Sequence, residues 1–373
     1  MKDELNVGGE GNDKKYLGFT LSELKEIGGV HTAKEICQQP SLWLKTWQLV
    51  VNQQTEIESF LSFVFKNNDL DVILTGAGTS AYIGNVLQGP FWKNTNKRTR
   101  AVATTDLLSH PLDYFNKTSA TLLVSFARSG NSPESAAVLD LANIYCEKVY
   151  HLVITCNPKG KLVRGITNTP SFVFFLPQEA DDQSLAMTSS FTSMLLAGLL
   201  ISRIGEVKNL YNEVQSLVDY GNNILRNYIF KMKQVAKLSF NRAVFLGSGP
   251  LLGAAKESHL KLQELTDGQV VCKYESFLGF RHGPKAVINS STLLVYLFSN
   301  NEYVHLYEKD LAEAVDKGQK GIYRIGIFES ENSGLPLDMP VILSNNQGKI
   351  KEEYLPVCSV LPAQILGFFK SVF

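Results

Sequence analysis

The sequence predicts an α/β protein made of two tandem copies of one fold, each a parallel sheet flanked by helices in three layers. The segment TLLV occurs at residues 121–124 and again at 292–295, an offset of 171 residues. The same offset relates Gly-Ala-Gly at 76–78 to Gly-Ser-Gly at 247–249. A period of this length is the size of a domain and far exceeds a solenoid repeat. Short apolar runs that alternate with helical patterns favour parallel strands covered on both faces.

A helical segment precedes the first copy. Thr20 with Glu23, and Thr32 with Glu35, have capping-box spacing and predict two helix starts. Pro40 should interrupt the helix, because proline lacks the N–H that an interior position needs. Strands are expected in the first copy at residues 71–74, 100–104, 120–126, 150–155 and 171–176, and helices at 81–91, 132–145 and 188–204.

The second copy follows an amphipathic stretch that should bridge the copies as helix. Its strands are expected at 242–246, 292–298, 323–328 and 341–343, and its closing helix at 361–373. The predicted organisation is an N-terminal tail and helical segment at 1–50, a first domain at 51–205, a helical linker at 206–240 and a second domain at 241–373.

The composition is that of an ordinary globular protein, with 44% hydrophobic and 19% charged residues in a chain of 373. Lys and Arg total 36, as do Asp and Glu, so the formal net charge is zero and argues against a nucleic-acid partner or a basic membrane face. No uninterrupted apolar run is long enough to span a bilayer, and the polar N-terminus lacks a signal core. Five scattered cysteines without CxxC spacing indicate free thiols in a reducing cytoplasm and no metal site.

A glycine-rich turn joins the first strand to its helix. Gly76 and Gly78 permit a tight turn, and Thr79 and Ser80 open a helix whose N-terminus favours anions. The pattern G-x-G-x-x-A is also a weak dinucleotide fingerprint, and a nicotinamide-dependent dehydrogenase is one alternative. Asp106, the nearest acid for a ribose, comes too late for that function. A tight turn without a ligand is the other alternative.

The loop after the third strand is rich in phosphate-binding groups. Ser132 is a good N-cap, and Arg128, Ser129, Gly130 and Asn131 precede it with a guanidinium, a hydroxyl and bare amides. An ordinary capped turn with an exposed Arg would look similar.

The corresponding loop of the second copy, residues 298–302, contains neither Gly nor Arg. This difference between the copies suggests that only the first holds phosphate.

The second copy offers proton-transfer groups instead. Glu257, Lys261 and Glu264 share one face of its first helix, although a solvated ion-pair stripe would show the same spacing. His282 lies in a Gly/Pro turn flanked by cations, a position that suits either a proton shuttle or a plain turn histidine.

These motifs together resemble the sugar isomerase (SIS) domain family. The motifs are Gly78-Thr79-Ser80, Ser129-Gly130-Asn131-Ser132, Lys261-Leu262-Gln263-Glu264 and His282-Gly283-Pro284. The resemblance runs from about residue 50 to the end as tandem SIS domains, similar to the isomerase half of glucosamine-6-phosphate synthase. It implies a flavodoxin-like three-layer αβα fold. The strings SFARSGNSPES and HTAKEICQQPSLW resemble most the tagatose-6-phosphate ketose/aldose isomerase and galactosamine-6-phosphate deaminase group.

The resemblance also implies roles at matching positions. Glu264 would move a proton between C1 and C2 of an open-chain sugar, Glu257 would support it, and His282 would assist ring opening. In the synthase this His comes from the neighbouring subunit, so a homodimer or a higher homo-oligomer is expected. The implied phosphate-binding residues are Gly78, Thr79, Ser80, Arg128, Ser129, Gly130, Asn131 and Ser132.

The expected function is a cytoplasmic phosphosugar aldose–ketose isomerase that needs no metal or cofactor. Its expected substrate is an amino-hexose 6-phosphate, with deamination or simple isomerisation as the outcome. The alternative is a regulator that binds sugar phosphate without turnover, because SIS modules also occur in regulators.

Overall fold

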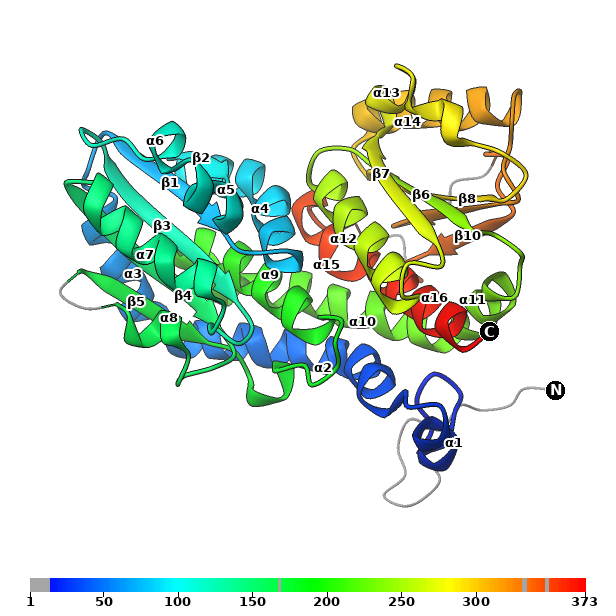
Figure 1. The fold of residues 1–373 in the computed structure, drawn as a ribbon, viewed down its shortest axis with the longest axis horizontal. Coiled ribbons are helices and arrows are strands. Elements are labelled where there is room, and N and C mark those ends of the chain that lie inside the picture. The colour runs from blue at the N-terminus through cyan, green and yellow to red at the C-terminus, as the bar shows by residue number, and fades with distance from the viewer. Residues whose placement is uncertain (1–13, 167–168, 331–333, 346–348) are drawn as a thin grey trace. The chain divides into compact units, whose positions relative to one another are not determined.

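The structure, a computed structural model, describes residues 14–166, 169–330, 334–345 and 349–373. The part of the predicted tail at residues 1–13 lies outside this description. The described residues form two compact units, each with one five-stranded sheet (Figure 1). The first-sheet unit comprises Ser41–Asp182 and Ser189–Gln215, and the second-sheet unit comprises Met1–Pro40, Gln183–Thr188 and Ser216–Phe373.

The first sheet is entirely parallel, with strand order β2-β1-β3-β4-β5. Its strands are β1 (Leu70–Thr75), β2 (Arg98–Ala101), β3 (Ala120–Ala127), β4 (Lys148–Thr155) and β5 (Ser171–Phe175). Every residue of β3 is buried, as expected for a central parallel strand covered on both faces.

Helices cover both faces of the first sheet. One face packs against α5, α7 and α8 through a core that includes Ile73, Leu123 and Val153, and α4 and α9 pack on the other face. The helices of this unit are α3 (Gln54–Val64), α4 (Thr79–Thr95), α5 (Thr104–Ser109), α6 (Pro111–Tyr114), α7 (Pro133–Tyr145), α8 (Lys161–Arg164) and α9 (Ser189–Ser202), with 3-10 turns η1 (Gln178–Ala180) and η2 (Ile204–Leu210).

The second sheet repeats the first, with strand order β10-β9-β8-β6-β7 and parallel pairing throughout. Its strands are β6 (Arg242–Gly247), β7 (Val271–Ser276), β8 (Thr292–Leu297), β9 (Tyr323–Phe328) and β10 (Met339–Ile342). Helices α13 and α14 lie on one face and α12 and α16 on the other (Figure 1).

The remaining helices belong to the second-sheet unit, except that the sequences of α2 and α10 are divided between the two units. The helices that lie wholly or partly in this unit are α1 (Leu21–Glu26), α2 (Val30–Asn52), α10 (Tyr211–Asn227), α11 (Ile229–Ala236), α12 (Pro250–Leu265), α13 (Phe277–Phe280), α14 (Glu302–Asp316), α15 (Leu355–Ser359) and α16 (Leu361–Val372), with 3-10 turns η3 (Pro284–Val287) and η4 (Glu352–Tyr354).

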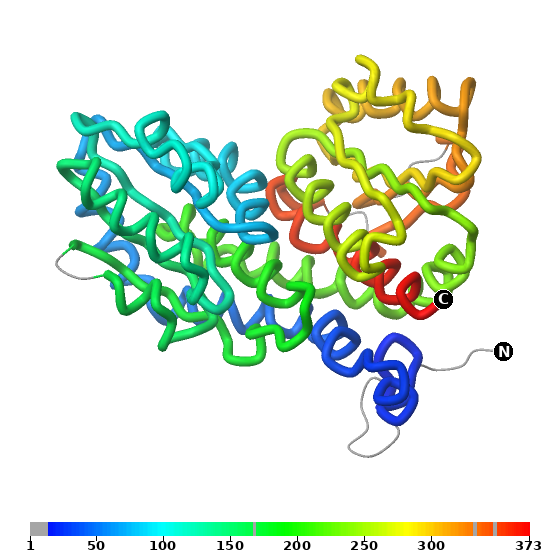
Figure 2. Tube along the Cα trace, in the orientation of Figure 1, coloured from blue at the N-terminus to red at the C-terminus, as the bar shows by residue number. Residues whose placement is uncertain are grey.

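The backbone confirms the internal repeat of the predicted α/β fold. Gly78 and Gly249 precede α4 and α12 with nearly the same dihedral angles, φ 56° and ψ −128° against φ 53° and ψ −125°. A Cβ on Gly76 or on Gly247 would overlap the first turn of the following helix. Figure 2 shows the two copies as separate stretches of colour, cyan to green and then yellow to red. The two halves of the chain are therefore copies of one βαβ arrangement.

Two predictions about local structure are wrong. Helix α2 begins at Val30 and runs through Pro40, so neither the capping box at Thr32 nor the break at the proline exists. The Gln39 side chain donates to the Ile36 carbonyl (3.2 Å), the group that Pro40 cannot reach for lack of an N–H. Gln39 also donates to the Gln364 side chain in α16 (2.7 Å), which anchors this part of the helix. The capping box at Thr20 is confirmed.

Two helical stretches among the described residues are long and apolar enough for a membrane crossing by length and composition. They are Glu352–Val372 and, as a bent pair, Ser189–Ser202 with Ile204–Asn227. Within the first, 83% of the most apolar window is buried inside the protein, and every residue of α9 is buried. Such burial is typical of core helices.

All five cysteines are free. Burial raises the pKa of every one of these thiols, so none is a ready nucleophile.

Candidate active site

The two predicted phosphate-binding loops begin at neighbouring strand ends. β1 and β3 pair side by side as far as Thr75 and Ser125, and each continues directly into one of the loops. The strand order places β2 on one side of this pair and β4 on the other. The connection after β1 therefore leads to one edge of the sheet, and the connection after β3 leads towards the other edge. In open α/β sheets, ligands bind at the carboxyl ends of the strands at such a switch point.

The glycine turn leaves the N-terminus of α4 open to an anion. Gly78 takes the N-cap position with positive φ and has no side chain with which to cap the helix. Thr79 and Ser80 follow with only 6% and 5% of their surfaces exposed. The Ser80 and Ala81 amides donate to the Ala77 and Gly78 carbonyls (3.1 and 2.9 Å), so this helix start offers an anion the positive end of the helix dipole rather than these two amides.

The second loop, residues 128–132, is fixed by hydrogen bonds from the segment that follows β4. The Asn157 side chain donates to the Ser129 carbonyl (2.8 Å), and the Leu162 amide donates to the Gly130 carbonyl (2.8 Å). Gly130 has φ 59°, which favours glycine. These contacts give the loop a defined conformation before any ligand binds.

The individual side chains of this loop have different tasks. Ser132 caps α7 by accepting from the Ser135 amide (3.2 Å), and Asn131 accepts from the Lys161 amide (3.2 Å). Ser129 is exposed, and Arg128 is partly buried beside it. Ser129 thus offers the most accessible hydroxyl of the loop.

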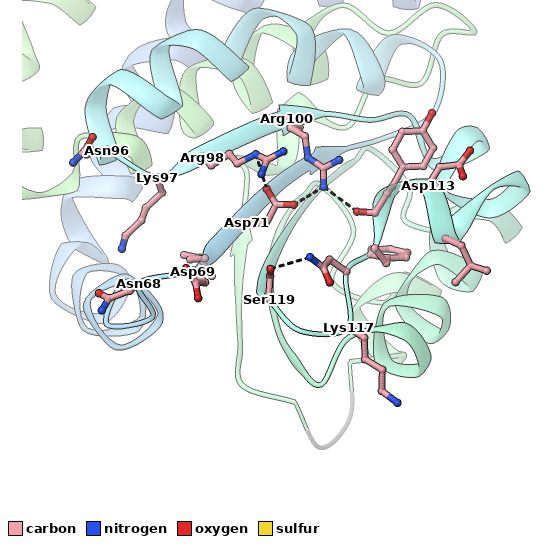
Figure 3. Close-up of a pocket in the computed structure, with 15 residues that line it drawn as sticks. Asn68, Asp69, Asp71, Asn96, Lys97, Arg98, Arg100, Asp113, Lys117 and Ser119 are labelled. Atoms are coloured by element: carbon pink, nitrogen blue, oxygen red, sulfur yellow. Dashed lines mark hydrogen bonds and ion pairs between the residues drawn. The ribbon is translucent and has the colours of Figure 1, made fainter.

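A cavity of about 570 Å³ lies at the opposite, amino edge of the same sheet (Figure 3). Its floor is an internal charge cluster in which Arg100 contacts the Asp71 carboxylate and the Tyr114 carbonyl, and Arg98 lies 3.8 Å from the other oxygen of Asp71. None of the predicted site residues lines this cavity. It is separate from the candidate active site.

The acid–base candidates of the second copy form a buried ion cluster on α12. The Lys261 ammonium lies 3.4 Å from a Glu257 oxygen and donates to a Glu264 oxygen at 2.6 Å. The side chains of Glu257 and Lys261 are 0% exposed, and that of Glu264 is 30% exposed. The solvated-stripe alternative is therefore wrong. Of the three charged groups, only the Glu264 carboxylate reaches solvent.

Lys261 was not predicted as a site residue. It lies in the motif Lys261-Leu262-Gln263-Glu264, and its spacing of i, i+4 from Glu257 was the available signal. Burial is what distinguishes it from a surface ion-pair partner, and the sequence pattern does not carry that information.

Glu264 lies at the amino edge of the second sheet. The neighbouring Gln263 side chain accepts from the Cys272 amide near the start of β7 (3.1 Å). His282 follows β7 and α13, with an exposed side chain in the turn made by Gly283 (φ 107°). The six residues of β7 separate these positions by roughly 17–20 Å along the strand. Within this unit the structure does not bring His282 and Glu264 together.

Comparisons with known proteins identify relatives along almost the whole chain. The chain matches no protein-family model. It is 36% identical over 365 residues to the D-galactosamine-6-phosphate deaminase AgaS of Shewanella sp. (strain ANA-3), covering 97% of this chain and 90% of the relative.

Solved structures give the same result. The tagatose-6-phosphate ketose/aldose isomerase of Escherichia coli matches with a TM-score of 0.86 at 34% identity and covers 93% of both chains. The C-terminal domain of glucosamine-fructose-6-phosphate aminotransferase from Francisella tularensis shares the fold, with a TM-score of 0.76 at 17% identity over 92% of this chain and 96% of its own. The chain therefore belongs to the AgaS family of tandem sugar isomerase (SIS) proteins.

Proposed function

We propose that this protein is a phosphosugar aldose–ketose isomerase that acts on an amino-hexose 6-phosphate. Galactosamine 6-phosphate, deaminated to a ketose 6-phosphate, is the favoured substrate, and tagatose 6-phosphate isomerisation is the related reaction. The observation that carries this proposal is the similarity to a galactosamine-6-phosphate deaminase over nearly the whole chain. The chemistry at the two candidate loops is compatible with it.

In this proposal the domain at 51–205 grips the phosphate. Thr79, Ser80, Ser129 and Ser132 would supply hydroxyls, Arg128 a guanidinium, and Gly78, Gly130 and Asn131 the backbone shape. The position of both loops at the switch point between β1 and β3 supports this role. Binding energy at the phosphate, remote from the reacting carbons, would hold the open chain in register.

The domain at 241–373 would carry out the proton transfer. Glu264 would remove the proton from C2 of the open-chain amino sugar and return it to C1, which converts the enolamine into an imine at C2. Water then adds to the imine carbon and ammonia leaves. The contact with Lys261 would orient the Glu264 carboxylate, and Glu257 would balance the buried ammonium.

His282 would act in ring opening from the neighbouring subunit of a homodimer. Its separation from Glu264 along β7 supports a role at another copy's site. The minimum active unit would then be a dimer with shared active sites.

The direct test is incubation of the purified protein with galactosamine 6-phosphate, followed by assays for ammonia and ketose 6-phosphate. We expect equimolar release of both. Galactosamine without phosphate should react far more slowly, because it lacks the group that the first loop binds. Saturable binding of the sugar phosphate without product would contradict the proposal and identify a regulator.

A further inference from the structure

The second copy retains the serine turn on which the first copy's phosphate loop is built. In the first copy the Asn131 amide donates to the Ser129 hydroxyl (3.3 Å), and in the second the Asn301 amide donates to the Ser299 hydroxyl (3.0 Å). Both turns follow the central strand that pairs with the glycine-turn strand, β3 beside β1 and β8 beside β6. Ser299 is therefore the counterpart of Ser129.

The hydrogen-bond donors of Ser299 are already occupied by carboxylates of the same chain. Its amide donates to Glu308 Oε2 (2.8 Å), and its hydroxyl donates to Glu352. The hydroxyl of Ser248, in the glycine turn after β6, also bonds to the Glu308 carboxylate. Ser129, in contrast, is exposed, and in the part of the chain that the structure describes its hydroxyl donates to no acceptor.

Glu308 stands in an unusual place for a charged residue. The buried positions of α7 are Ser135, Val138, Leu139 and Ala142, and those of α14 are Glu308, Leu311, Ala312 and Val315, with the same spacing. Counted from the first residue of each helix, Glu308 is the seventh residue of α14, where α7 has the buried Leu139. Its side chain is 0% exposed, and Oε1 finds no hydrogen-bond donor within the described residues.

Burying a carboxylate costs free energy unless donors receive it. The amide of Ser299 and the hydroxyl of Ser248 are donors of the kind that hold phosphate oxygens. Burial nevertheless raises the pKa of Glu308 to about 7, with the Glu352 charge adding to the shift. The enclosed position therefore disfavours the charged carboxylate, and the donors of Ser299 and Ser248 are what hold a carboxylate there against the cost of burial.

We propose that the second copy contains a second anion-binding site of the phosphate-loop type, occupied internally by the carboxylates of Glu308 and Glu352. These side chains take the place of a ligand's phosphate oxygens at Ser299 and Ser248. The copy that carries Glu264 therefore does not compete for sugar phosphate, and each chain binds one phosphate group, at the first copy.

The test measures binding of inorganic phosphate by equilibrium dialysis in a Ser129→Ala background, in which the first loop is disabled. The parent Ser129→Ala protein should bind no phosphate. Adding Glu308→Ala and Glu352→Ala should open the second site and bring the stoichiometry to one phosphate per chain. Adding Glu147→Ala and Glu313→Ala instead removes two glutamates outside the site and should give no binding.

A folded triple variant that binds no phosphate would overturn the proposal. If Ser129→Ala alone still binds phosphate, the Ser129 hydroxyl is not essential at the first loop, and a further gain of one phosphate per chain from the glutamate changes remains the test of the second site. Circular dichroism of each variant establishes that it is folded.

A second measurement applies even if the triple variant does not fold. In protein labelled with 15N-serine, the Ser299 amide resonance should titrate with a midpoint near pH 7, because it donates to Glu308. This titration should be absent from Glu308→Gln and unchanged in Glu313→Gln. Glu308 has two titratable neighbours, Glu352 and His305, whose ring nitrogen lies 3.9 Å away. Burial lowers the pKa of His305, so its own transition falls at lower pH. A Ser299 amide that does not respond near pH 7 would refute the internal occupancy.

Discussion

Glu264 is the residue on which the proposed chemistry depends. Glu264→Gln keeps the size of the side chain and a hydrogen-bonding oxygen for Lys261 but removes the base. We expect turnover of galactosamine 6-phosphate to fall by a factor of about 10³ or more, while affinity for the sugar phosphate changes little. Single-turnover assays and calorimetric titration measure the two quantities. Glu313→Gln, a change of the same type on α14, serves as the control, and near-normal turnover by Glu264→Gln would refute the assignment.

Lys261 stabilises the fold through the same cluster. Lys261→Met removes the ammonium and leaves Glu257 as a buried charge, and a broken buried pair costs about 3–5 kcal/mol. Urea denaturation should show this loss in the free energy of unfolding. The double change Lys261→Met with Glu257→Leu should recover most of it, because no charge then stays buried. A single variant as stable as the wild type would contradict the cluster.

The buried His151 side chain should make the free energy of unfolding depend on pH, independently of the active site. It lies in β4 with 1% of its surface exposed, and burial lowers its pKa from 6.5 to about 4. Between these values the unfolded chain binds a proton that the folded protein does not, so stability falls as the pH drops from 6.5 towards 4, by about 3 kcal/mol in all. His151→Leu should remove this part of the dependence in urea titrations at several pH values. The exposed His110, changed to Gln, should leave it intact.

The turns before α4 and α12 have the same backbone conformation, but we expect only the turn before α4 to bind phosphate. Gly78 and Gly249 have the same dihedral angles, and a Cβ at either position meets open space, so alanine would cause backbone strain only. We expect Gly78→Ala and Gly249→Ala to lower the free energy of unfolding by a similar amount, about 1–3 kcal/mol. Gly78→Ala alone should weaken binding of sugar phosphate. Equal effects of both changes on binding would mean that the copies share the task.

Most elements of both sheets could be predicted from the sequence, because buried parallel strands are short apolar runs followed by glycine turns. β3 and β8 carry the same TLLV segment and were predicted almost to the residue. β7 was missed because Val271–Ser276 is an edge strand of mixed polarity whose residues are partly or fully exposed. The predicted helix break at Pro40 was wrong for a different reason: the Gln39 side chain donates to the Ile36 carbonyl, which the proline cannot bond.

The candidate site was predictable only in part, and the limit was again burial. The sequence spacing puts Glu257, Lys261 and Glu264 on one helical face, but only the packing around α12 shows that two of them are enclosed. The role of Glu308 had no sequence signal, since a glutamate in an amphipathic helix normally faces water.

For the whole molecule, the proposed dimer predicts complementation between inactive variants. Glu264→Gln and His282→Ala should each be inactive alone. If His282 serves the partner's site, mixed dimers contain one intact site, and unfolding and refolding the two proteins together should restore about a quarter of wild-type activity. Light scattering should show a dimer in each preparation. No recovery in the mixture would place both residues in sites formed by one chain.

The order of synthesis on the ribosome conflicts with the order in which the second-sheet unit can close. Residues 14–40 are synthesised before the rest of this unit, yet one of their anchors is the contact between Gln39 and Gln364 in α16. The first-sheet unit has all its residues once position 215 has been translated. The segment at residues 14–40 must therefore wait for this contact for more than three hundred further codons, and it is the segment for which a chaperone would matter most.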